Sequence, residues 1–107
     1  MVDDARGHYE AIAAELTAVG AATAGQMFGM PTLKTRGKAF AGLYQGAMVF
    51  KLDVEARERA LGLAGAHRFD PSGRGRPMKE WVVVPAEHAG EWSGLADNAL
   101  EFVIGAA

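Results

Sequence analysis

The side chains with the clearest chemical potential in this chain are cations, and they form two clusters. The first cluster occupies alternate positions, which predicts that its members share one side of a strand and its turn. The second cluster lies in and after a glycine-rich loop. Guanidinium and ammonium groups bind phosphates and carboxylates, so both clusters are candidate sites for an anionic partner such as a nucleic acid. The members are Lys34, Arg36 and Lys38 in the first cluster, and Arg74, Arg76 and Lys79 in the second.

Other interpretations of these cations stay open. Bases on an edge strand keep sheets from pairing edge to edge, and the first cluster also fits that role or ion pairing with acidic helices. The second cluster also fits a solvated loop. Trp81 follows this loop at the start of a predicted strand, where it fits either the core or the floor of a groove. A small-ligand or enzymatic pocket beside Trp81 and Arg76 is therefore one alternative function.

The residues that usually carry catalysis or metal binding lack the necessary spacing. The chain has no cysteine, which excludes thiolate nucleophiles and disulfides. Its serines are Ser72 and Ser93, and neither lies in a nucleophile-elbow pattern. The histidines, His8, His67 and His88, lie far apart without the spacing of a metal site. We therefore predict no catalytic, cofactor-binding or metal-ligating residue, and no enzymatic activity.

Length and composition indicate one globular domain over residues 1–107, with 50% hydrophobic and 22% charged residues. No apolar run approaches the length of a membrane span, so we expect no membrane contact and a cytoplasmic location. The net charge of −2 is unevenly distributed. Residues 26–52 carry four bases and no acid, whereas residues 80–107 carry five acids and no base.

Hydrophobic periodicity predicts the elements that must position these residues. Helices are expected over about 3–19, 53–64 and 85–103, with Asp3 or Asp4 and then Asp53 as caps. Strands are expected over about 27–35, 39–44, 47–52, 67–69 and 80–84. Pro31 places the first strand at an edge or a bulge. The order α-β-β-β-α-β-β-α predicts an α+β two-layer sandwich, with a five-stranded antiparallel sheet and the helices on one face.

Alternation along the strands predicts which side chains share a face. Phe40 and Tyr44 are expected on one face of their strand, and Ala41 and Leu43 on the other. The strand that follows also carries apolar residues on both faces. This double-sided pattern favours burial of the second face by another copy of the chain, as a homodimer.

The order of several short motifs resembles the N-terminal domain of the TfoX/Sxy family over about residues 5–104. The motifs are Met27-Phe28-Gly29, Gly37-Lys38-Ala39-Phe40-Ala41, Phe50-Lys51-Leu52-Asp53 and Gly75-Arg76-Pro77-Met78, followed by Pro85. A more distant similarity to YjbR-type proteins rests on Met78-Lys79-Glu80-Trp81.

The resemblance implies a secretion-chaperone-like α+β fold and a bacterial regulatory protein, because TfoX/Sxy proteins are linked to DNA-uptake competence. Those regulators usually carry a second, C-terminal helical domain, and by the resemblance we expect these 107 residues to correspond to the N-terminal domain. The family has no established catalytic residues. Its recurring positions here include Met27, Phe28, Gly29, Lys51 and Pro77.

We therefore expect a non-enzymatic regulatory or adaptor domain that acts through protein–protein contacts or self-association. A nucleic-acid-associated regulator that uses the two basic clusters is the main alternative.

Overall fold

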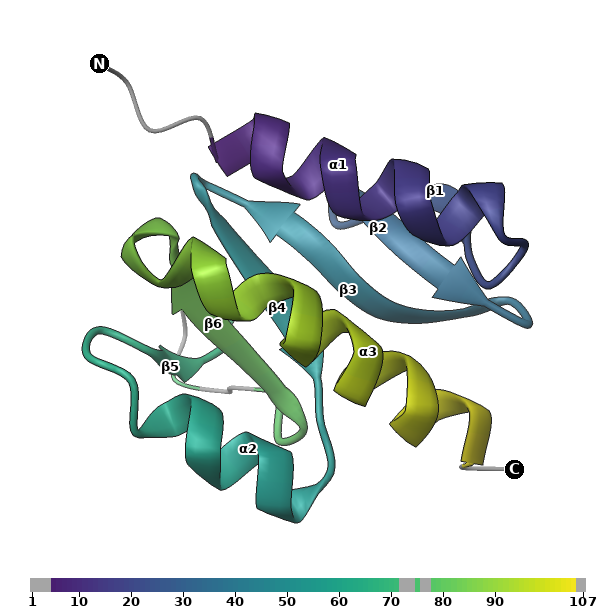
Figure 1. Ribbon diagram of the computed structural model, residues 1–107. Coiled ribbons are helices and arrows are strands. Elements are labelled where there is room, and N and C mark those ends of the chain that lie inside the picture. The colour runs from purple at the N-terminus through teal and green to yellow at the C-terminus, as the bar shows by residue number, and fades with distance from the viewer. Residues whose placement is uncertain (1–4, 72–74, 76–77, 106–107) are drawn as a thin grey trace.

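The computed structural model describes residues 5–71, 75 and 78–105, which form an antiparallel sheet with helices packed against it (Figure 1). The helices are α1 (Ala5–Ala18), α2 (Val54–Leu61) and α3 (Ala89–Gly105), with a 3-10 turn η1 (Ala86–His88) before α3. The strands are β1 (Thr23–Met27), β2 (Met30–Thr35), β3 (Lys38–Tyr44), β4 (Ala47–Lys51), β5 (His67–Arg68) and β6 (Trp81–Pro85).

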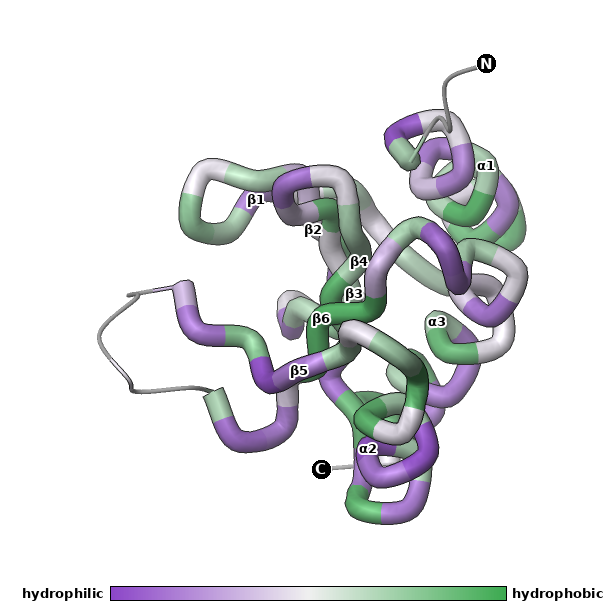
Figure 2. Tube along the Cα trace, turned by 90° about the vertical axis from the view of Figure 1, so that its left-hand side faces the viewer, coloured by the Kyte–Doolittle hydropathy of each residue, from purple (hydrophilic) through white to green (hydrophobic). Residues whose placement is uncertain are grey.

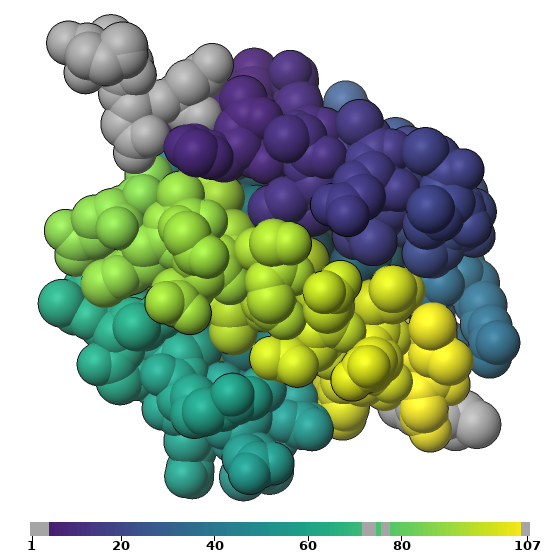
Figure 3. Space-filling model, in the orientation of Figure 1, coloured from purple at the N-terminus to yellow at the C-terminus, as the bar shows by residue number. Residues whose placement is uncertain are grey.

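The sheet contains six strands in the order β1-β2-β3-β4-β6-β5, and every neighbouring pair is antiparallel. The α+β class, the antiparallel sheet and the three helices of the prediction are confirmed, but the expected count of five strands was wrong. The three helices lie on one side of the sheet (Figure 2). Figure 3 shows them covering the side that faces the viewer.

A two-residue turn joins each neighbouring pair from β1 to β4. The turns are Phe28-Gly29, Arg36-Gly37 and Gln45-Gly46, and all six residues have φ between +50° and +80°. Two successive left-handed residues define the type I′ turn, whose twist matches that of antiparallel strands. The first four strands therefore form a regular meander.

The extra strand is β1, which occupies residues that we expected to be a connection. Its sequence, Thr-Ala-Gly-Gln-Met, has no alternating large apolar residues, because β1 is an edge strand with mostly exposed side chains. The predicted strand 27–35 is instead a hairpin that turns at Phe28-Gly29. Pro31 lies in β2, an inner strand, but pairing between β2 and β3 begins only at Thr32 and Gly42. Position 31 therefore lies outside that pairing.

A β-bulge overturns the expected faces of β3. Leu33 pairs with Ala41 and the next residue, Lys34, pairs with Ala39, so Phe40 is the extra residue. Phe40 and Ala41 both lie in the core on the helix side, whereas Tyr44 packs against the cluster on the other face. The prediction that Phe40 and Tyr44 share a face was therefore wrong.

Local chemistry accounts for the start of α2. Asp53 caps α2 as predicted, accepting a hydrogen bond of 2.9 Å from the backbone N–H of Ala56. However, α2 ends at Leu61, three residues earlier than expected. Pro85 ends β6 and precedes η1, so α3 begins at Ala89. The predicted caps Asp3 and Asp4 lie outside the described residues.

The helix-side core holds α1 and α3 against the sheet. Tyr9, Ile12 and Leu16 of α1 meet strand residues such as Phe40 and Phe50 there. A buried hydrogen bond joins α3 to the sheet. The Trp92 ring is completely buried, and its Nε1–H donates a hydrogen bond of 3.2 Å to the Val84 carbonyl of β6.

The second face of the sheet has its own apolar cluster. Met30, Val49, Phe69, Trp81 and Val83 form it, and the segment after β5 closes part of it. That segment is fastened by the backbone N–H of Met78, which donates a bond of 2.7 Å to the Phe69 carbonyl. The chain itself therefore buries much of the apolar surface that we had assigned to a dimer partner.

Candidate interaction site

Phe28 presents an aromatic ring to solvent from an unfavourable backbone position. It is the first turn residue between β1 and β2, has a φ of +53°, and is 63% exposed. Type I′ turns favour Asn, Asp or Gly at this position, and a bulky residue with positive φ is unusual. An exposed aromatic residue held in strained backbone is a reasonable starting point for a functional hypothesis.

The Phe28 ring is the outermost member of an aromatic chain that crosses the second face. It meets the Phe69 ring edge to face, with centroids 6.3 Å apart. Phe69 is completely buried and also contacts Tyr44 at 4.9 Å and Trp81 at 6.4 Å. The chain links the turn after β1, at one edge of the sheet, to the residue after β5, at the other edge. Figure 2 shows both segments on the side away from the helices.

A hollow of about 460 Å³ lies beside this ring, and we call it the Phe28 hollow. Its lining comes from the two turns that follow β1 and β3, from neighbouring apolar side chains, and from one cation of α1. The cation, Arg6, is paired with Glu10 at 3.4 Å, and its side chain remains 62% exposed. The lining residues are Arg6, Phe28, Gly29, Met30, Pro31, Leu43, Tyr44, Gln45 and Gly46.

A second hollow of about 260 Å³ shares Tyr44, Gln45 and Gly46 with the first. It continues past Ala47 towards β6, where Val83 and Pro85 line it. The turn between β3 and β4 thus stands between two depressions lined by both apolar side chains and polar groups. Such a surface suits an apolar or aromatic side chain with a polar neighbour from a partner protein, because buried anchors of this kind dominate many interfaces.

The first predicted basic cluster lies around the turn between β2 and β3. Arg36 is in that turn, and Lys38 is exposed. Lys34 pairs with Ala39 while Lys38 pairs with Thr35, so the two lysines occupy adjacent ladder positions. Adjacent positions point to opposite faces of a sheet. The expectation that the cluster shares one side was therefore wrong for Lys34 and Lys38.

The second predicted cluster is only partly described. Arg74, Arg76 and the motif residue Pro77 lie outside the described residues. Lys79 is exposed. Trp81 is only 5% exposed and belongs to the apolar cluster on the second face of the sheet. Trp81 lines neither the Phe28 hollow nor the smaller hollow that continues from it.

The remaining motif positions have structural roles. Gly29 supplies the second left-handed residue of the turn after β1, and Met27 precedes that turn. The Lys51 ammonium lies 3.8 Å from the Glu80 carboxylate, and both side chains are partly exposed. Of the TfoX-like motif positions, Gly29 therefore shapes a turn, Lys51 forms an ion pair, and Phe28 is the exposed aromatic residue.

Charge is divided between the sheet and the helices. The described strands, with their turns and the segment after β5, carry six Lys or Arg and two acids. The described helices and their caps carry three Arg and nine acids. The strands and their connections, which we call the strand side, are therefore net positive, and the helices are net negative, although Lys34 and Lys38 point to opposite faces of the sheet. This division favours an acidic partner on the strand side.

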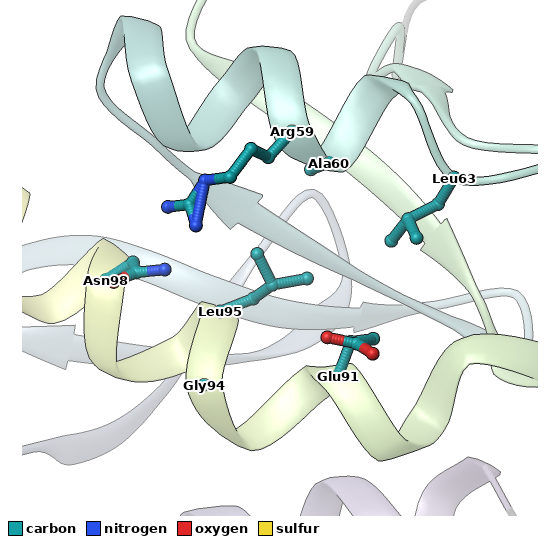
Figure 4. A pocket seen from close by; sticks show the side chains of 7 residues that line it. All are labelled: Arg59, Ala60, Leu63, Glu91, Gly94, Leu95 and Asn98. Atoms are coloured by element: carbon teal, nitrogen blue, oxygen red, sulfur yellow. The ribbon is translucent and has the colours of Figure 1, made fainter.

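Another group of polar side chains converges between α2 and α3, in a groove of about 330 Å³ (Figure 4). Arg59 and Asn98 stand at one end, Glu91 and Leu63 stand at the other, and Ala60 and Leu95 lie between them (Figure 4). Opposite charges across an apolar floor could accommodate a zwitterion. However, Arg59 and Glu91 are both exposed to solvent, so water weakens their attraction for a ligand.

Among residues 5–71, 75 and 78–105, no group of three or more His, Asp or Glu side chains could hold a metal ion. No helix in that part of the chain is both long and apolar enough to cross a bilayer. The described histidines make contacts within the fold. His88 Nε2 lies 2.8 Å from the Ala64 carbonyl, and the His8 ring meets the Trp92 ring edge to face.

Comparisons with family models, with curated proteins and with solved structures found no match to this chain. The TfoX resemblance therefore rests on the motifs quoted above. Sequence reasoning identified Phe28 as a motif position but missed its exposure and the hollow beside it. The available signal was the Phe-Gly pair before β2, which matches the Arg36-Gly37 and Gln45-Gly46 turns.

Proposed function

We propose that this chain is a non-enzymatic adaptor domain of the TfoX N-terminal type. It binds a protein partner or a second copy of itself, and the Phe28 hollow anchors the protein partner. The observation that carries this proposal is the exposed Phe28 ring in a left-handed backbone position. An exposed phenylalanine lowers solubility, and its bulky side chain is unfavourable in the turn. A contact with another molecule best explains its presence there.

The chemistry of the hollow indicates what the partner supplies. The lining is apolar around Met30, Pro31 and Leu43, with Arg6 at its margin. A partner segment with an apolar or aromatic side chain beside an acidic residue fits both features. The positive strand side would draw the same acidic partner into contact.

Phe28→Asn tests this proposal, because asparagine suits the turn and removes the ring. The matched control is Arg36→Asn, which makes the same substitution at the equivalent position of the turn after β2, outside the lining of the Phe28 hollow. Immobilised wild-type protein and both variants are exposed to lysate from the source organism, and captured proteins are quantified by mass spectrometry. We expect the wild type and Arg36→Asn to enrich the same proteins, and Phe28→Asn to lose them.

Equal enrichment by all three proteins would contradict the anchor role of Phe28. A captured protein is then titrated by calorimetry against each variant. Loss of a central aromatic anchor reduces affinity by about thirtyfold or more. An unchanged affinity for Phe28→Asn would show that the protein binds elsewhere.

The charge division supports a second candidate function, association with a nucleic acid through the strand side. Lys34, Arg36 and Lys38 contribute three of the six described cations there. Stacking on bases has limited support, because Phe69 and Trp81 are buried and Phe28 alone of these three rings is exposed. This candidate therefore depends on phosphate contacts.

A mobility-shift titration with mixed-sequence duplex at low salt tests this candidate. Binding should fall steeply with salt, and replacing Arg36 and Lys38 with Gln should weaken it. Arg6→Gln with Arg59→Gln, both on helices, removes the same number of charges and is the control. No shift at low salt would eliminate the candidate.

A further inference from the structure

We infer that two copies of this chain pair through β1, edge to edge, as antiparallel strands. This inference names the surface for the self-association in the proposed function, and in that respect rests on it. The strand β1 is one edge of the sheet and β5 is the other. The pairing uses backbone groups of β1, not the Phe28 hollow.

The two edges differ in their protection against pairing. β1 has five residues, Thr-Ala-Gly-Gln-Met, with no charged residue and no proline. β5 has only two residues, His67 and Arg68. Natural sheets protect their edges with short strands, charges, prolines or bulges. β5 has such protection, whereas β1 has none in its own sequence.

The register of the first hairpin shows which backbone groups are free to pair. Met27 and Met30 flank a two-residue turn, so they form a hydrogen-bonded pair. Hydrogen-bonded and non-hydrogen-bonded pairs alternate along the ladder. Gly25 and Thr23 therefore direct their N–H and C=O groups to β2, whereas Ala24 and Gln26 direct theirs outward. Both Ala24 and Gln26 are exposed.

A second copy satisfies these groups when a two-fold axis passes beside Gly25. Ala24 of each copy then pairs with Gln26 of the other, and the two Gly25 residues face each other as a non-hydrogen-bonded pair. Backbones approach most closely at such pairs, about 4.5 Å between Cα atoms. A Cβ built on Gly25 would lie 3.0 Å from Lys34 Cε of the same chain, so the Lys34 side chain lies over this point. The pairing would set the two Phe28 turns about 20 Å apart.

The position of Lys34 predicts how this pairing responds to salt. Its side chain lies over Gly25, so the two Lys34 ammonium groups would approach each other near the axis. Like charges repel, and added salt screens them. Dimerisation should therefore strengthen with salt and with Lys34→Gln. Nucleic-acid binding has the opposite salt dependence.

Sedimentation equilibrium over a wide concentration range, at low and high salt, tests the pairing. We expect the mass to rise from 11.3 kDa towards twice that value, and more readily at high salt. Gln26→Pro removes an outward N–H without breaking the ladder to β2, and should weaken dimerisation about tenfold or more. Gln26→Ala keeps the N–H and should dimerise like the wild type. Circular dichroism checks that each variant folds.

A mass of 11.3 kDa under every condition would overturn the inference, as would a folded Gln26→Pro variant that dimerises like the wild type. Amide exchange gives an independent result, since Ala24 and Gln26 should gain protection at high concentration. Phe28→Asn separates this inference from the anchor role. It should still dimerise even if it loses its partner, and Gln26→Pro should still bind the partner.

Discussion

The ring of Phe28 meets the ring of Phe69 edge to face, at a centroid distance of 6.3 Å and an interplanar angle of 71°. Phe28 follows the strand at one edge of the sheet, and Phe69 follows the strand at the other. The contact therefore joins the two edges across the second face. Its exposed half is the surface that we propose as the anchor for a partner.

The turn residues at positions 28 and 45 give a paired prediction on stability. Gln45→Asn should raise the free energy of unfolding by about 0.5–1 kcal/mol, because asparagine tolerates positive φ better. Phe28→Asn should change it by less than about 1 kcal/mol, since the gain in the turn is offset by losing the contact with Phe69. Urea unfolding of both variants measures the difference. A large loss for Phe28→Asn would make Phe28 a structural residue.

Phe69 should be the most costly aromatic residue to remove from the second face. It is completely buried and contacts three other aromatic rings. Phe69→Ala should lower the free energy of unfolding by about 3–5 kcal/mol, and Phe69→Leu by clearly less. Chemical denaturation measures both. A small effect of Phe69→Ala would mean that the apolar cluster on the second face contributes little to the stability of the fold.

Tyr9 should make stability sensitive to alkaline pH. Burial raises the pKa of Tyr9 from 10.0 to about 12, so the fold favours the neutral phenol. This contribution is fully present below pH 10 and is lost as the pH rises towards 12. Thermal unfolding of Tyr9→Phe across this range should show a shallower decline than the wild type. Parallel declines would indicate that Tyr9 ionises normally in the folded protein.

Arg57 is a buried cation whose hydrogen bonding is incomplete. It is 8% exposed, its Nη2 donates to the Leu52 carbonyl at 3.2 Å, and its Nε has no partner among the described residues. Arg57→Met should change the free energy of unfolding by less than about 1.5 kcal/mol, because methionine keeps much of the packing.

Arg57→Ala is the comparison for this prediction. It should cost about 2–3 kcal/mol, because it removes both the packing and the hydrogen bond. Denaturant titrations of the two variants distinguish these contributions. If Arg57→Met costs as much as Arg57→Ala, the guanidinium itself is required, and the unpaired Nε would need another explanation.

Elements with a strong local signal could be predicted from the sequence. The Asp53 cap that starts α2 and the apolar stripe of α3 have short-range causes, whereas the end of α2 was placed three residues too late. The strand β1 could not be predicted in this way, because an edge strand of Thr, Ala, Gly and Gln has no alternating apolar pattern. The bulge at Phe40 depends on pairing with β2 and shifts one side chain to the other face.

The candidate site was missed for a related reason. Lysines and arginines attract attention in a sequence, whereas a Phe-Gly pair usually indicates core. The exposure of Phe28 follows from its place in a two-residue turn, and that depends on β1 being a strand. Once β1 is recognised as a strand, all three connections are two-residue turns that end in glycine. Phe28 is then the only aromatic residue at the first position of these turns.

Amide chemical-shift mapping during titration with the captured partner tests the central claim most directly. The Phe28 hollow predicts that shifts concentrate at the turns after β1 and β3, around Phe28, Tyr44 and Gly46. Shifts that concentrate instead between α2 and α3, around Arg59 and Asn98, would contradict the claim and assign binding to the helix side.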